Sequence, residues 1–247
     1  MTAASPAAQI GMNPWVSVVR SHVGCVRQIN EDRALDRPDL ALWAVADGMG
    51  GHDAGDRAAQ MIIDSLGEAD GTRSGWGLLD DIRMRLFEAN AMLVARGRMT
   101  GRTSGATIVA LVARQERCAW LWAGDSRGYR LRDGTLTRVT RDHSYVQELL
   151  DAGLIAPGEA RSHPRANVIT RAVGAEQTLE IELRHDMVQP GDRLLLCSDG
   201  LTAMLDDDEI ASRLAGKAIE DAADRLIDAT LAAGARDNVT VVLVEAR

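Results

Sequence analysis

Short apolar runs recur along most of the chain, and each is rich in Val, Leu, Ile or Trp and bounded by Gly, Asp or Pro. Runs of this length and composition are typical of strands. The dipeptide Asp133-Gly134 favours a tight hairpin turn between two short strands, because it supplies positive φ angles. The strands predicted in this way are Trp15–Arg20, Leu40–Ala46, Thr107–Ala113, Cys118–Trp122, Gly128–Arg132, Leu179–Leu183, Arg193–Cys197 and Thr240–Val244.

Helical periodicity appears in fewer and longer segments. In the longest one, apolar residues recur at helical spacing from Leu79 to Leu93. The acidic run Asp206–Glu209 is expected to cap a later helix and to favour its dipole. The predicted helices are Asp56–Leu66, Leu78–Ala95, Ser144–Leu150, Asp207–Leu214 and Ile219–Ala233.

The order of these elements predicts the fold class. Two strands are followed by two helices, a long series of strands, two more helices and a last strand. Strict strand–helix alternation is missing, so antiparallel sheets with helices packed outside are favoured over a doubly wound parallel sheet. We expect residues 1–12 to form a flexible tail and residues 13–247 to form a single domain.

Composition narrows the class of protein. A hydrophobic fraction of 46% is ample for one core, and a net charge of −8 argues against a nucleic-acid binder. No apolar stretch is long enough for membrane insertion, and the N-terminus lacks the pattern of a signal peptide. Cys25, Cys118 and Cys197 are odd in number and widely spaced, which predicts reduced thiols and a cytoplasmic location. We expect a monomer.

Asp and Gly residues gather where the predicted strands end. A strand delivers its terminal Asp to the edge of a sheet, and the Gly behind it lets the backbone turn. One such Asp is usually a turn residue or a helix cap. Asp47, Asp125 and Asp199 all have this position, and Asp32 and Asp237 lie near other strand ends, so turns alone do not explain the set.

Carboxylates gathered at one place repel each other unless cations lie between them. Hard oxygen ligands suit Mg²⁺ or Mn²⁺, with water in the remaining positions. Zinc is disfavoured, because no cluster of His or Cys has the spacing of zinc ligands. The sequence therefore predicts a magnesium or manganese site.

Five motifs, in this order, resemble the bacterial type 2C metal-dependent protein phosphatases of the PPM family. The resemblance extends from about Val18 to Val244. The motifs are Arg-x-x-Asn-Glu-Asp at Arg27–Asp32, Asp-Gly-Met-Gly-Gly-His at Asp47–His52, Gly-Asp-Ser-Arg at Gly124–Arg127, Ser-Asp-Gly-Leu at Ser198–Leu201 and Asp-Asn-Val-Thr at Asp237–Thr240.

The resemblance implies a four-layer α-β-β-α sandwich with a two-metal site at one end of the paired sheets. It implies that Asp47 bridges both metals, that the Gly48 carbonyl binds one of them, and that Asp32, Asp199 and Asp237 complete the shell directly or through water. Two such ions activate a shared water for direct attack on phosphorus and neutralise the phosphate. The implied reaction is hydrolysis of phosphoserine and phosphothreonine in proteins, opposing a bacterial serine/threonine kinase.

Three further roles follow from the same resemblance. Arg27 grips the substrate phosphate with paired hydrogen bonds, and His52 protonates the leaving alkoxide as a general acid. Asp125 belongs to a third, weaker metal site shared with Asp199. Thr107 and Asn238 are expected to support the site by hydrogen bonds, and residues 144–175 correspond to a flap beside the active site, or else to a packing insertion.

Other functions fit the sequence less well. A cysteine-dependent phosphatase needs an Arg six residues after its thiolate, but Glu31, Gly124 and Ala203 occupy those positions. No complete dinucleotide or Walker-type glycine motif is present. The remaining alternative is a catalytically weak phosphoprotein-binding module with the same fold, which metal-dependent turnover of a phosphopeptide would distinguish from an enzyme.

Overall fold

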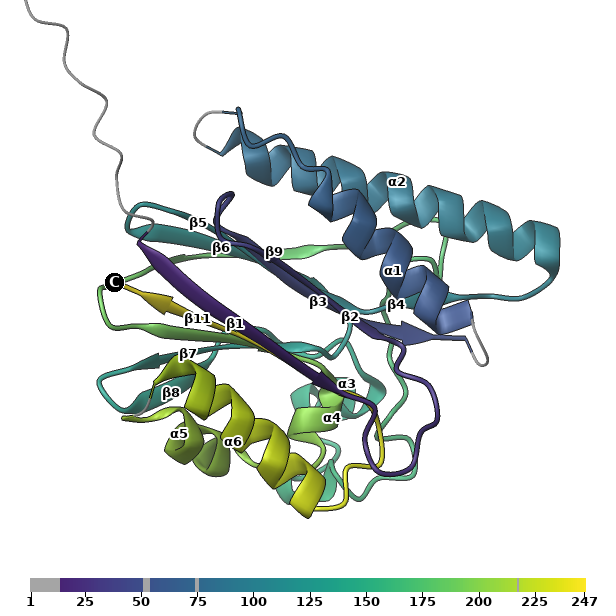
Figure 1. The fold of residues 1–247 in the computed structure, drawn as a ribbon. Coiled ribbons are helices and arrows are strands. Elements are labelled where there is room, and N and C mark those ends of the chain that lie inside the picture. Colours follow the sequence, from purple (N-terminus) through teal and green to yellow (C-terminus); the bar gives the residue numbers. More distant parts are fainter. Residues whose placement is uncertain (1–13, 51–53, 74–75, 217) are drawn as a thin grey trace, which may run out of the picture.

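The computed structural model describes residues 14–50, 54–73, 76–216 and 218–247, which form two antiparallel sheets between two layers of helices (Figure 1). The first sheet has the strand order β1-β11-β10-β7-β8. Its strands are β1 (Trp15–His22), β7 (Arg127–Arg132), β8 (Thr135–Arg138), β10 (Arg193–Cys197) and β11 (Val239–Ala246).

The second sheet has the order β2-β3-β5-β6-β9, and the short strand β4 pairs with β3. Its strands are β2 (Asp32–Arg37), β3 (Leu42–Met49), β4 (Gly105–Ala106), β5 (Ile108–Arg114), β6 (Arg117–Ala123) and β9 (Glu182–Met187). Antiparallel pairing in both sheets confirms the predicted fold class.

Helices cover the outer face of each sheet (Figure 1). The second sheet is covered by α1 (Ala54–Gly67) and α2 (Gly77–Thr100), and the first by α5 (Asp207–Leu214) and α6 (Ile219–Ala232). Shorter pieces lie near the site described below: α3 (Tyr145–Asp151), a 3₁₀ turn (Pro157–Glu159) and α4 (Asp199–Thr202). No helix within the described ranges combines the length and the apolar character that a membrane crossing requires.

The central strands are buried on both faces, which explains their continuous apolar runs. In β5, Ile108 and Val112 face α1 and α2, whereas Val109 and Leu111 point between the two sheets. In β11, the side chains likewise alternate between the inter-sheet layer and α6. A strand that is buried on both faces lacks the polar residues that alternate along a half-exposed strand. Its length and the residues that bound it are then the features that identify it in the sequence.

Several strands differ from the sequence prediction, and the two-residue β4 was not predicted. β2 was not predicted, because its sequence is mostly charged and only Asp32 and Leu35 are buried. β3 continues through Asp47 to Met49 instead of ending before it. β9 begins at Glu182, because Leu179 packs on the core outside any strand and pairing with β6 starts three residues later.

The helix predictions are largely confirmed, including the expected cap at the acidic run Asp206–Glu209. The Ser144 hydroxyl caps α3 by accepting a hydrogen bond from the backbone N–H of Gln147. Asp206 caps α5: its Oδ1 accepts from the backbone N–H of Glu209 at 2.8 Å, and the Glu209 carboxylate accepts from the N–H of Asp206 at 3.0 Å. This reciprocal pair satisfies two backbone donors at the helix start.

Asp206→Ala should therefore lower the free energy of unfolding by about 1 kcal/mol, because it removes the cap of α5. The matched control is Asp208→Ala, an exposed acidic residue of the same first turn that caps nothing, and it should change stability by less than about 0.5 kcal/mol. Urea denaturation of both variants measures the difference. Equal losses would show that first-turn charge, not the cap, stabilises this end of α5.

Candidate active site

The acidic motifs converge on one pocket of about 260 Å³ at the ends of several strands. β3, β6, β10 and β11 each bring an Asp to it, and the loop before β2 adds Arg27 and Glu31. Its lining is Arg27, Glu31, Asp47, Gly48, Met49, Gly50, Thr107, Asp125, Asn167, Ile169, Asp199, Asp237 and Asn238. Asp32 is not part of the lining, because its side chain is buried beside the pocket with only 2% exposed.

Sheet register places Asp32 and Asp47 directly opposite each other on β2 and β3. The Asp32 carboxylate accepts a hydrogen bond from the Ser198 hydroxyl at 2.8 Å, which joins β2 to the start of α4. Thr107 holds Asp47 from the other side: its hydroxyl accepts from the Asp47 N–H at 3.3 Å, and its own N–H donates to the Asp47 carbonyl at 2.9 Å. The predicted supporting role of Thr107 is therefore seen in the structure.

Two glycines of the motifs allow backbone segments to approach closely. A Cβ on Gly48 would lie 2.3 Å from the carbonyl oxygen of Gly55, and a Cβ on Gly200 would lie 1.9 Å from that of Asn238. Neither distance is compatible with a side chain. Gly48 thus lets β3 meet the start of α1, and Gly200 lets α4 meet the start of β11 with Asp199 beside it.

Arg27 lies at the rim of the pocket with about half of its side chain exposed. Its guanidinium donates to Asp237 Oδ2 at 2.7 Å. Asn238 holds the loop that carries Arg27, because its amide accepts from the N–H of Glu31 and donates to the carbonyls of Val23 and Ile29. The expectation that Asn238 supports the site by hydrogen bonds agrees with these contacts.

Burial and mutual repulsion both disfavour the ionised forms of the carboxyl groups at the pocket. Burial raises the pKa of Asp32 to about 7, and repulsion by Asp199 and Asp237 adds to the effect. Burial also raises the pKa of Asp199 to about 6, again with repulsion by Asp237. The pKa of Asp47 and that of Asp125 lie well above the usual value, for burial first and for neighbouring carboxylates second.

The donor set fits a hard divalent cation. Within the described residues, two buried carboxylate oxygens, Asp32 Oδ1 and Glu31 Oε1, have no hydrogen-bond partner. No group of three His, Cys, Asp or Glu side chains in the described ranges could hold a metal ion by itself. An ion in this pocket would therefore need other oxygen donors beside these carboxylates, such as backbone carbonyls and water, which is the mixed coordination that Mg²⁺ and Mn²⁺ accept.

The structure adds residues to the site that the motifs did not assign. Glu31 lines the pocket, and burial raises the pKa of its carboxyl. The position of Glu31 between Asn30 and Asp32 in the first motif is the sequence feature that could have assigned it to the site. Asn167 and Ile169 also line the pocket, so the segment 144–175 lies beside it. His52, the predicted general acid, lies outside the described residues.

Comparison with known proteins gives the family. Residues 26–234 match the model of the protein phosphatase 2C family. The chain is 40% identical over 228 residues to the serine/threonine protein phosphatase PstP of Mycobacterium tuberculosis, covering 92% of this chain but 44% of PstP. It is 37% identical over 236 residues to the serine/threonine phosphatase stp of Listeria welshimeri, covering 92% and 94%. The chain thus spans less than half the length of PstP.

Solved structures agree with this result. PppA, described as a key regulatory component of T6SS in Pseudomonas aeruginosa, superposes with a TM-score of 0.88 at 43% identity, covering 94% of this chain and 98% of that one. The catalytic domain of PstP, solved in complex with two manganese ions, has a TM-score of 0.85 at 37% identity and covers 94% and 97%. The four-layer sandwich is therefore shared with solved PPM phosphatases. The chain belongs to the protein phosphatase 2C family.

Metal-free protein should lose stability as the pH rises from about 4 to 7. The pKa values of Asp32 and Asp199 lie above those of the unfolded chain, so the folded protein binds more protons in this window. Stability should fall by about 1.4 kcal/mol per pH unit for each extra proton bound. Urea denaturation in EDTA from pH 4 to 8 measures the slope.

Asp32→Asn is the matched variant, because it keeps the shape of the side chain but cannot ionise. Its metal-free stability should fall less steeply over the same window, and the difference between the two slopes isolates Asp32 from other titrating groups. Parallel slopes would show that Asp32 is not protonated preferentially in the folded state.

Proposed function

We propose that this chain is a Mn²⁺- or Mg²⁺-dependent phosphatase that hydrolyses phosphoserine and phosphothreonine in proteins. The observation that carries the proposal is the acidic pocket with an exposed Arg27 at its rim and with buried carboxylate oxygens that lack partners in the described chain. Membership of the protein phosphatase 2C family and the two manganese ions of the PstP catalytic domain support it.

The proposed metal ligands are Asp47, Gly48 through its carbonyl, Asp32, Asp199 and Asp237, directly or through water. Bound divalent ions would neutralise these carboxylates and supply Lewis-acid activation of water and of the phosphate. The charge balance of the pocket favours this role, because the carboxylates outnumber the single cationic side chain that lines it among the described residues.

Arg27 is positioned to bind a phosphate at the entrance of the pocket. One of its amino groups donates to Asp237, and a guanidinium has five N–H donors, so others can reach phosphate oxygens. The ion pair with Asp237 also orients the side chain before substrate arrives. His52 is proposed to protonate the leaving alkoxide, a role that rests on its motif alone.

The proposed substrates are phosphorylated proteins, including a cognate serine/threonine kinase. The three cysteines form no disulfide, which supports a reducing, cytoplasmic location, and we propose a monomer. The alternative is a binding module that holds phosphoproteins without turnover. Asp47, Asp125, Asp199 and Asp237 line one pocket and Asp32 is buried beside it, which favours the enzyme.

Turnover of a phosphothreonine peptide should require added Mn²⁺ or Mg²⁺ and should cease in EDTA. Asp47→Asn should reduce turnover at saturating Mn²⁺ by orders of magnitude, because a neutral amide replaces the carboxylate of a proposed metal ligand. Phosphate release measures the reaction, and circular dichroism checks the fold of the variant. Tight phosphopeptide binding without turnover would support the binding module, and turnover after complete chelation would exclude the metal mechanism.

Asp125→Ala should keep two tightly bound metal ions but lose most turnover, because Asp125 is proposed to hold a third, largely hydrated ion with Asp199. Calorimetric Mn²⁺ titration and steady-state kinetics measure the two effects separately. Asp125→Asn is the matched control, since it keeps an oxygen acceptor for the turn but not the charge. Normal turnover in Asp125→Asn, with reduced stability in Asp125→Ala, would assign Asp125 to the turn instead.

A further inference from the structure

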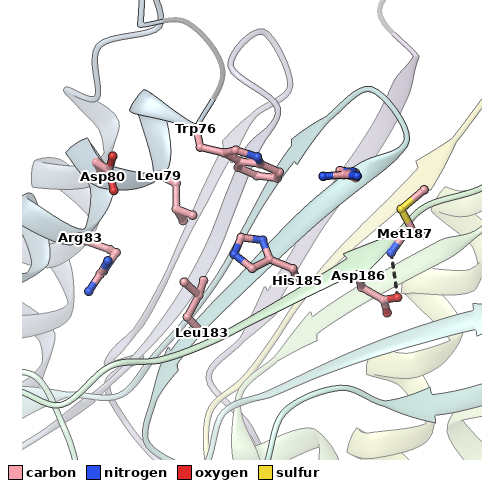
Figure 2. A pocket seen from close by; sticks show the side chains of 9 residues that line it. Trp76, Leu79, Asp80, Arg83, Leu183, His185, Asp186 and Met187 are labelled. Atoms are coloured by element: carbon pink, nitrogen blue, oxygen red, sulfur yellow. Dashed lines mark hydrogen bonds between the residues drawn. The ribbon is translucent and has the colours of Figure 1, made fainter.

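A second pocket, of about 680 Å³, lies between α2 and the edge strand β9 (Figure 2). It shares no lining residue with the active-site pocket. β9 ends its sheet, pairing with β6 on one side only. The lining consists of Trp76, Leu79, Asp80 and Arg83 from the α2 side, Arg117 from β6, and Leu183, His185, Asp186 and Met187 from β9.

The floor of this groove is apolar and incompletely covered. Leu183, His185 and Met187 alternate along β9 and therefore point to the same face of the sheet, toward α2 (Figure 2). Leu183 remains 38% exposed and Met187 47% exposed. Trp76 contacts His185 edge to face, with ring centroids 5.2 Å apart, and forms the wall at the middle of the groove. The helical layer thus stops short of the last strand.

The free edge of β9 offers backbone hydrogen-bonding groups beside this floor. Val188 donates its N–H to the Glu116 carbonyl at 2.8 Å, so these two residues form a hydrogen-bonded pair between β9 and β6. In an antiparallel ladder every second residue is bonded to the neighbouring strand, and the residues between them turn their N–H and C=O groups the other way. Leu183 and His185 therefore turn their N–H and C=O groups away from β6. Among the described residues these groups have no partner, whereas the Met187 carbonyl accepts from Arg132.

The unpaired charges of the groove are mainly positive, although the chain carries a net charge of −8. Asp186 is neutralised by Arg130 at 2.6 Å. Arg83 and Arg117 make no hydrogen bond or ion pair within the described chain, and Asp80 is the opposing unpaired charge. Arg117 lies opposite Met187 at one end, and Figure 2 shows Arg83 toward the other end, where Leu183 lies.

We propose that this groove binds an extended segment of a partner protein, which adds as a strand to β9 and carries acidic residues on either side of an apolar one. Strand addition satisfies the free N–H and C=O groups of β9, and alternate side chains of the segment then lie over the apolar floor. A bound helix would satisfy its own backbone and leave the edge of β9 unpaired. The two arginines at the ends of the groove select acidic residues two positions from the central one.

The probe is a fluorescein-labelled peptide with the sequence Thr-Glu-Thr-Phe-Thr-Glu-Thr, which places both Glu and the Phe on one face of a strand. Fluorescence anisotropy with the full chain should show saturable binding below about 1 mM. Replacing both Glu by Lys in the peptide, or Arg83 and Arg117 by Glu in the protein, should weaken binding at least about tenfold. No binding at 1 mM, or equal binding of the Lys peptide, would overturn the proposal.

Leu183→Pro and Leu183→Ala form the decisive pair. Both remove the Leu side chain, but only Pro removes the N–H that points to the free edge, and the pairing with β6 does not use that donor. Leu183→Pro should bind the probe at least about tenfold more weakly than Leu183→Ala. Thermal unfolding checks that both variants fold. If Leu183→Pro does not fold, His185→Pro and His185→Ala repeat the comparison at another residue whose N–H points to the free edge of β9.

Two further results would replace strand addition by another occupant. A helical circular dichroism signal from the bound peptide would show that the groove receives a helix. Concentration-dependent dimerisation of the chain alone, abolished by Leu183→Pro but not by Leu183→Ala, would show that a second copy pairs with β9. Either result would overturn the proposed partner.

Discussion

Mutual repulsion among buried carboxylates is the constraint on which the rest of this structure depends. Asp32, Asp47, Asp125 and Asp199 all have pKa values raised by burial and by one another, so the folded chain holds them together against their electrostatic preference. Protonation relieves this repulsion at low pH, and a divalent cation would relieve it at neutral pH. When the carboxylates are neither protonated nor bound to a cation, packing of the apolar layers supplies the free energy that keeps the site assembled.

The scaffold meets this constraint with short-range supports on every side of the pocket. Thr107 brackets the backbone of Asp47, Ser198 donates to Asp32, and Asn238 ties the Arg27 loop to the start of β11. Gly48 and Gly200 remove the side chains that would keep neighbouring segments apart. Apart from the Gly48 carbonyl, which is a proposed metal ligand, these residues do not carry the chemistry, but each fixes a carboxylate or the arginine to a strand end that the core already holds.

The two pockets differ in the charges that they present. The active-site pocket is lined by carboxylates, so it suits cations and, once cations are bound, a phosphate. Arg27 is the cationic side chain among its described lining residues. The groove beside β9 is apolar with two arginines at its ends, and it draws on the backbone edge of the same sheet whose other strands supply Asp32 and Asp47. Together, the proposed phosphatase site and the proposed groove would bind one substrate protein both at its phosphorylated residue and at a remote segment.

The sequence by itself determined most of the elements, the sandwich class and the identity of the acidic cluster, because these depend on local apolar runs and on motifs of a few residues. It did not determine β2, whose charged sequence becomes a strand only beside β3, or the start of β9, which pairing with β6 decides. The contacts of Arg27 with Asp237, and of Ser198 with Asp32, join residues far apart in the chain. Only the tertiary structure decides such pairs, and the open groove at β9, because they depend on which strands become neighbours and where the helical layer ends.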